Sequence, residues 1–170
     1  MRIRILRSRF LTRAWPFALV GCRQHETILY GALMRYLVEA FAVGALRRGR
    51  SVEQFLGPTG SPERPGVRWV EVRPASGRYE VFLHTAQDVG HPGFMDLFEF
   101  PPLDLDDEEE EFGRLVATAD DPLTALAEAA GRAGAVSGRW VNTGLAQDEY
   151  IDFVRAGRPA RESSDAQPPI

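Results

Sequence analysis

The sequence predicts an α+β domain in which an antiparallel sheet of about four strands carries helices packed on one face, with a long apolar helix near the N-terminus. The first observation is a change of period: residues 67–100 alternate between apolar and polar side chains as strands do, whereas residues 26–48 and 122–134 have helical patterns. The second is size, because 170 residues, 44% of them hydrophobic, are enough for one core. We therefore expect a basic segment at 1–25, a helical segment at 26–57, a Gly/Pro linker at 58–66, a core domain at 67–157 and a disordered tail at 158–170.

The basic segment at 1–25 allows two interpretations. Five of its first 13 residues are Arg, and a short apolar stretch then leads to Cys22, the only cysteine of the chain. Leu19–Cys22 looks like the cleavage site of a bacterial lipoprotein, so a lipid-anchored envelope protein attached at Cys22 is one alternative. Against it, the apolar stretch has only seven residues, is interrupted by Pro16, and is followed by no polar tether. A single cysteine also excludes an intramolecular disulfide and a cysteine-based zinc site.

The helical segment is expected to contain one long helix and one short one. Residues 28–46 are apolar almost throughout, but Arg35 and Glu39 lie in their middle, and each charge would be costly at the centre of a bilayer. We therefore expect no membrane span, and a helix that is buried or that forms a homo-oligomer through residues 28–46. Ser51 and Gln54 have the spacing of a capping box, which predicts a short helix at 51–56. Six Gly or Pro residues among residues 57–66 predict a linker.

The core domain is expected to begin with a meander of strands at 67–73, 79–84 and 94–100, with a hairpin turn at 74–77 and a fourth strand at 114–118. Asp120 or Asp121 should cap a helix that carries Pro122 in its first turn and ends at Gly134. A short strand at 139–142 and a helix at 147–155 complete the domain. The residues expected in the core are Trp69, Val81, Leu83, Phe98, Phe100, Leu123, Leu126 and Trp140.

Four side chains between two predicted strands form a candidate metal site. Histidine and carboxylate ligands suit zinc, iron or nickel, and the candidates are His84, Asp88, His91 and Asp96. The spacing matches no known site, and Gly and Pro residues interrupt the loop, so we expect no metal and no cofactor. A metal-dependent enzyme using the loop from His84 to Asp96 stays open as an alternative. The chain has no Lys and no Gly-x-Ser-x-Gly motif, which excludes Schiff-base chemistry and that form of nucleophilic serine.

Charge is distributed unevenly along the chain. The net charge is −4, yet residues 1–65 carry 11 Arg and four acids, and residues 66–170 carry nine Arg and 20 acids. A run with seven acids in eight positions could bind a cationic partner, and the segment at 139–142 has the Arg and Trp side chains that anchor interfaces. The candidate partner-binding residues are Asp104, Asp106, Asp107, Glu108, Glu109, Glu110, Glu111, Arg139 and Trp140. The core domain is acidic, and the sequence contains no motif of interleaved aromatic and basic residues. Both observations argue against nucleic acid as the partner.

Several short stretches carry a family resemblance. They are residues 51–57, Arg68–Val72, Tyr79–His84, Phe98–Leu103 and Arg139–Asn142. Together they resemble small uncharacterised actinobacterial proteins, some of which are similar to immunity proteins of bacterial polymorphic toxin systems. The resemblance covers roughly residues 45–160. The resemblance implies a small cytoplasmic, non-catalytic α+β protein. We therefore expect it to bind another protein, and the most specific form of this hypothesis is an inhibitor of a basic toxin domain.

Overall fold

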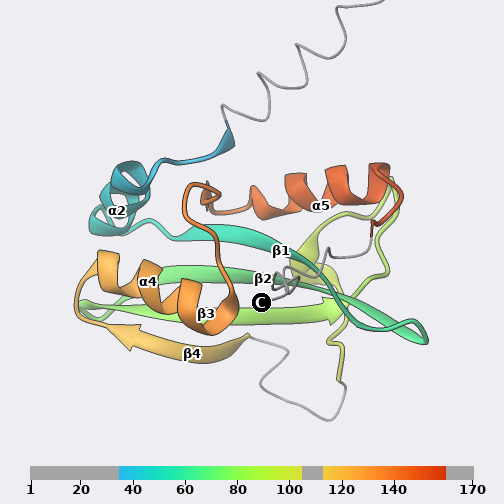
Figure 1. Ribbon diagram of the computed structural model, residues 1–170, viewed down its shortest axis with the longest axis horizontal. Coiled ribbons are helices and arrows are strands. Elements are labelled where there is room, and N and C mark those ends of the chain that lie inside the picture. The colour runs from blue at the N-terminus through green and yellow to red at the C-terminus, as the bar shows by residue number, and fades with distance from the viewer. Residues whose placement is uncertain (1–34, 105–112, 160–170) are drawn as a thin grey trace, which may run out of the picture. The chain divides into compact units, whose positions relative to one another are not determined.

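A five-stranded antiparallel sheet organises the protein (Figure 1). The computed structural model describes residues 35–104 and 113–159. The sheet order is β4-β3-β2-β1-β5, so the first four strands follow one another as a meander and β5 joins the free side of β1. In chain order the elements are α2 (Glu39–Arg47), β1 (Val52–Ser61), β2 (Arg64–Ala75), β3 (Arg78–Gln87), the 3-10 helix η1 (Leu97–Glu99), β4 (Arg114–Ala119), α4 (Pro122–Ala133), β5 (Val141–Asn142) and α5 (Ala146–Arg155).

The hairpin predicted at residues 74–77 is confirmed. Ala75 pairs with Arg78, so the turn has two central residues, and both Ser76 (φ 49°) and Gly77 (φ 82°) are left-handed. Such a turn matches the right-handed twist of the strands that it joins. The strand predicted at 114–118 is confirmed as β4, which pairs with β3 along its length.

The predictions for residues 51–66 are wrong, because this segment forms β1 and the start of β2. Gln54 is not a capping residue. Its side-chain amide reaches instead to Val136, far along the chain, and that tertiary contact overrides the local pattern. The Gly and Pro residues of the predicted linker lie in the outer part of the β1–β2 hairpin, where Gly57 and Gly60 adopt positive φ and Pro58 pairs with Val67.

The long apolar helix predicted over 28–46 is also wrong within the described residues. Only Glu39–Arg47 is a regular helix, because Leu37 lies in a β-bridge, with its N–H donating to the carbonyl oxygen of Trp140 at 2.7 Å. Val38 is extended, with ψ at 153°. The part of the prediction at 28–34 lies outside the described residues, and the oligomer through residues 28–46 stays a prediction. No helix in the described part of the chain is long and apolar enough to cross a membrane.

The strand predicted at 94–100 is replaced by an irregular segment. His91 and Phe94 form a single bridge, and η1 follows, with the Asp96 side chain accepting a hydrogen bond from the Phe98 N–H at 3.0 Å. This local capping turns the chain where a third strand of the meander was expected. The place beside β3 goes to β4 instead.

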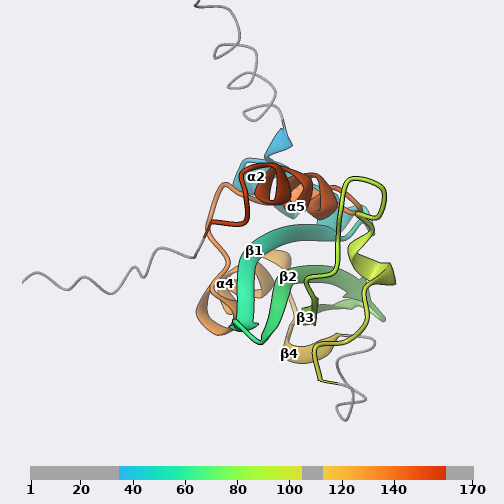
Figure 2. The same ribbon diagram turned by 90° about the vertical axis from the view of Figure 1, so that its right-hand side faces the viewer.

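Helices and loops cover both faces of the sheet, not one face as predicted. On the face that we call the α2/α4 face, α2 and α4 cover an apolar cluster of strand residues: Val52, Val70, Val72, Val81 and Leu83. On the opposite face, the α5 face, α5 and residues 88–103 cover Phe55, Val67, Trp69 and Ala86. Figure 2 shows α4 and the yellow-green segment of residues 88–103 on opposite sides of the strands.

Helix α4 begins and ends as predicted. Asp121 accepts hydrogen bonds from the N–H groups of Leu123 and Thr124, both at 3.0 Å, and Gly134 closes the helix in the left-handed conformation. Its buried stripe consists of Pro122, Ala125, Leu126, Ala129 and Ala133.

Six of the eight predicted core residues are buried, and two are not. The confirmed residues are Trp69, Val81, Leu83, Phe100, Leu126 and Trp140. Leu123 is 52% exposed because it lies off the buried stripe of α4, and Phe98 is 57% exposed because η1 holds it on the outside of the α5 face.

Candidate functional site

A row of polar side chains crosses the middle of the α5 face. Glu53 on β1 and Glu71 on β2 are direct cross-strand partners, and Trp69 on β2 is the partner of His84 on β3. Since alternate residues of a strand point to the same face, all four side chains lie on one side of the sheet. Antiparallel pairing thus brings two carboxyl groups, an imidazole and an indole together in one buried row.

Glu53 is the most unusual member of this row. Its side chain is 0% exposed, and its Oε2 atom accepts a hydrogen bond from the Gly144 N–H at 3.0 Å. Its Oε1 atom is buried and has no hydrogen-bond partner among the described residues. Burial, helped by the charge of Glu71, raises the pKa of Glu53 to about 7 against the lowering effects of the Gly144 and Ala146 backbone N–H groups. The carboxyl group is therefore divided between its neutral and ionised forms near neutral pH.

The pKa of Glu71 is shifted in the opposite direction. Burial acts to raise the pKa of Glu71, but interactions with His84, Ser51 and Arg73 outweigh it, and the pKa is lowered. His84 Nε2 lies 3.5 Å from Glu71 Oε2. The pKa values of the two neighbouring glutamates are thus shifted in opposite directions, which is a pattern found in carboxyl pairs that divide acid and base roles.

Aromatic rings enclose the histidine end of the row. The rings of Trp69 and His84 stack with their centroids 4.8 Å apart, and the edge of Phe98 meets both rings, at 5.4 and 5.6 Å. Gly113 also lies against His84, where a Cβ atom would come within 2.5 Å of the imidazole. The Trp69 Nε1–H is buried and has no partner among the described residues.

Two cavities lie beside the row. The first, about 230 Å³, is lined by Trp69, His84, Phe98 and Phe100, among others. The second, about 340 Å³, has Glu53, Asp96, Phe98, Gly144 and Gln147 in its walls, and we call it the Glu53 cavity. Leu97 and Phe98 of η1 belong to both walls, so this short helix separates the two spaces.

The four predicted metal-site residues do not come together. His84 belongs to the row described above. Asp88 accepts hydrogen bonds from the Tyr150 hydroxyl at 2.6 Å and from Arg158 at 2.7 Å. The other two make local hydrogen bonds. His91 accepts one from the Gly93 N–H, and Asp96 caps η1. In the part of the chain that the structure describes, no three His, Cys, Asp or Glu side chains are placed to hold a metal ion.

The predicted partner-binding residues have mixed outcomes. Most of the acidic run, residues 106–111, lies outside the described residues, and Asp104 is the last described residue before it. On either side of the run, Pro102 forms a bridge with Ala86 on β3, and Gly113 lies against His84. Both described ends of the run are therefore held at the same side of the sheet.

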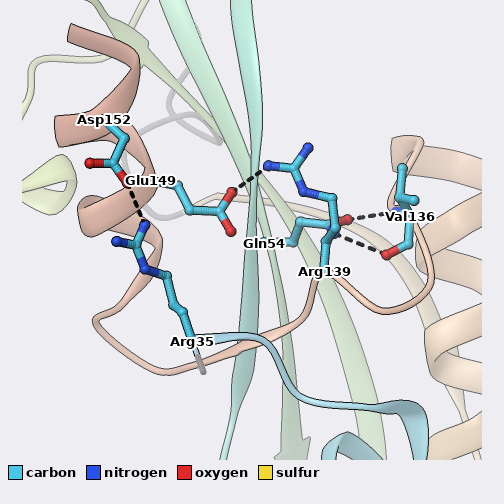
Figure 3. A network of polar contacts seen from close by, with 6 residues as sticks. All are labelled: Arg35, Gln54, Val136, Arg139, Glu149 and Asp152. Atoms are coloured by element: carbon cyan, nitrogen blue, oxygen red, sulfur yellow. Dashed lines mark hydrogen bonds and ion pairs between the residues drawn. The ribbon is translucent and has the colours of Figure 1, made fainter. Parts of the chain in front are cut away.

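The segment at 139–142 is corrected in part. Trp140 is a core residue of the α2/α4 face rather than a surface anchor, because its backbone forms the bridge with Leu37 and its side chain is buried. Arg139 is half exposed and bonds the buried carboxylate of Glu149 at 2.9 Å, as Figure 3 shows. Nearby, Arg35 bonds Asp152 at 2.8 Å.

Glu53 and Glu71 are not among the site residues predicted from the sequence. Residues 51–56 were predicted to be a helix, and a helical Glu53 would have no cross-strand partner. Its pairing with Glu71 was therefore not predicted. A usable signal was present in Trp69–Val72, where period two puts Glu71 on the same face as Trp69. A charged residue sharing a face with a core tryptophan indicates a buried polar site.

Comparison of the chain with protein-family models, with curated proteins and with solved structures found no match.

Proposed function

We propose that the protein acts by binding another protein, and specifically that it is an immunity-type inhibitor of a basic toxin domain. The observation that carries the proposal is where the described chain on either side of the acidic run lies. Pro102 pairs with Ala86 on β3, and Gly113 lies against His84 on the same strand. The sequence between these two residues carries seven acids.

Exposed apolar side chains support a contact surface at the same place. Phe98 is 57% exposed and leans on His84, while Leu115 is 50% exposed and pairs with Phe82, which shares the α5 face with His84. β4 is also an edge strand of the sheet, paired with β3 on one side only. Exposed aromatic and aliphatic groups beside an edge strand are features that protein partners use.

The negative charge of the acidic run is the reason to propose a basic partner. Seven acids in the eight positions of residues 104–111 create a strongly negative segment, which accelerates the approach of a cationic protein at low salt. A toxin that acts on nucleic acid needs a basic surface to hold its polyanionic substrate. An acidic inhibitor surface would compete directly for that basic surface.

The experiment pairs the protein with any toxin domain that is found encoded beside its own gene. We expect coexpression to restore the growth of cells that the toxin domain arrests, and purified proteins to form a one-to-one complex. Association should be fast at low salt and should slow steeply as salt is added. The variant Asp106→Asn/Asp107→Asn/Glu108→Gln/Glu109→Gln should slow association about 10-fold or more at low salt and flatten its salt dependence.

A control variant removes the same number of charges elsewhere, at the exposed acids Glu39, Glu63 and Asp120 and the half-exposed Glu128: Glu39→Gln, Glu63→Gln, Asp120→Asn and Glu128→Gln. We expect its association rate to stay within about threefold of the unaltered protein. Equal slowing by both variants would mean that only net charge matters and would contradict a binding role for the run. A neighbouring toxin domain that forms no complex would overturn the immunity proposal.

A further inference from the structure

We propose that the Glu53 cavity binds an organic cation, an ammonium or guanidinium group, with the Glu53 carboxylate as its principal partner. The inference deepens the proposed function, on which it depends only for the source of the cation. That source is either a basic side chain of the protein partner or a small free amine.

The first support is the free oxygen of Glu53. Buried polar atoms in proteins are almost always hydrogen-bonded, yet Glu53 Oε1 has no donor among the described residues. Glu53 is also one of the residues in the wall of the cavity. A ligand that supplies an N–H group would satisfy an acceptor that the fold leaves open.

The second support is the charge of the walls. Asp96 adds a second carboxylate, and Thr143 and Gln147 add polar side chains, while no Arg is among the lining residues. An anion would be repelled by the two carboxylates in such a space. Ammonium and guanidinium groups carry several N–H donors and a positive charge, which is what carboxylates bind best.

The third support is shape and access. The cavity holds about 340 Å³, and exposed residues such as Asp96 and Phe98 contribute to its walls, so it opens to solvent. The Phe98 ring offers an aromatic surface of the kind that cations approach. A metal ion fits less well, because no third carboxylate or imidazole in the described part of the chain is placed to complete a coordination sphere.

Binding should be coupled to ionisation of Glu53. The charged groups that face Glu53 are Glu71 from β2, with His84 behind it, and Asp96 from the segment before η1. From α5 the neighbours Ala146 and Gln147 are uncharged, and Glu149 is engaged by Arg139. The pKa of Glu53 is about 7, and a cation prefers the ionised form, so affinity should rise about 10-fold from pH 6 to pH 8.

The test uses the full chain and titration calorimetry with two probes, agmatine and a blocked Gly-Arg-Gly peptide. We expect saturable one-to-one binding that strengthens with pH and releases protons. The variant Glu53→Gln should weaken binding at pH 8 at least 10-fold and abolish its pH dependence, whereas Glu99→Gln, which removes an exposed acid of η1, should leave both unchanged. Because Glu53→Gln could disturb folding, a second variant, Gln147→Lys, places a cation at the cavity wall and should block both probes.

Each outcome is decisive. Binding of the peptide identifies a basic side chain as the ligand, and binding of agmatine alone identifies a small free amine. Absence of binding by both probes at pH 8, or binding that Glu53→Gln leaves unchanged, would overturn the inference. Failure of the proposed function reads differently: the probes would bind normally, but no toxin domain would form a complex.

Discussion

The two faces of the sheet are built from the same strands, yet they treat polar groups in opposite ways. Gln54 and Glu53 are neighbours on β1 and point to opposite faces, and both are fully buried. On the α2/α4 face, the amide of Gln54 makes two hydrogen bonds with the backbone of Val136, at 2.6 and 3.0 Å (Figure 3). On the α5 face, Glu53 satisfies only one of its two oxygens.

This difference separates a face that stabilises the fold from a face that can bind. A buried polar atom without a partner costs roughly 1–3 kcal/mol, so an arrangement optimised for stability would pair or remove it. The α2/α4 face follows that rule in its apolar cluster and at Gln54, and its one exception among the described residues is Arg68 Nε. The other four unpaired buried atoms belong to the α5 face, on Glu53, Trp69, His84 and Glu149. Departures concentrated on one face, beside two cavities, indicate a ligand site.

The largest expected effect comes from breaking the α2/α4 face. Leu46 of α2 is fully buried in its apolar cluster, so Leu46→Ala should lower the free energy of unfolding by about 2–5 kcal/mol. Phe41 on the same helix is 66% exposed, and Phe41→Ala should cost less than about 1 kcal/mol. Urea denaturation measures both. Similar losses for the two variants would mean that α2 is not anchored on this face.

The next effect is a pH dependence that belongs to the α5 face. The pKa of Glu53 is raised to about 7, so the folded protein holds a proton that the unfolded chain releases from about pH 4.5 upward. The folded state is therefore favoured at low pH and loses that advantage as pH rises. Between pH 5 and pH 8 the loss attributable to Glu53 should be roughly 2–3 kcal/mol.

The measurement compares the unaltered protein with Glu53→Gln at several pH values. A glutamine keeps the size of the side chain and does not titrate, so the variant should gain stability relative to the parent as pH rises. The exposed Glu99→Gln variant provides the control. A stability difference for Glu53→Gln that stays constant from pH 5 to pH 8 would show that Glu53 is no more perturbed than a surface acid.

The same contrast explains which features the sequence could predict. Local signals were sufficient for α4, because Asp121, Pro122 and Gly134 act within the helix that they delimit. They failed for β1, where Ser51 and Gln54 have helical spacing but Gln54 is used by a contact 82 positions away. The candidate site was missed for the same reason, since the pairing of Glu53 with Glu71 exists only once β1 is a strand.

The smallest expected effect tests whether pairing is what makes a buried polar group acceptable on the α2/α4 face. Gln54→Leu keeps a side chain of similar size but removes both hydrogen bonds to Val136. The Val136 backbone then loses its partners, although Val136 is itself partly exposed and water can replace some of the contact. We therefore expect Gln54→Leu to lower the free energy of unfolding by about 1–2 kcal/mol in urea denaturation, which is less than the loss for Leu46→Ala.

A second variant, Gln54→Glu, retains an acceptor for the Val136 N–H but loses the donor and buries a carboxyl group, so its stability should fall further as pH rises. If Gln54→Leu proves as stable as the parent, the paired amide contributes nothing, and pairing does not distinguish the two faces.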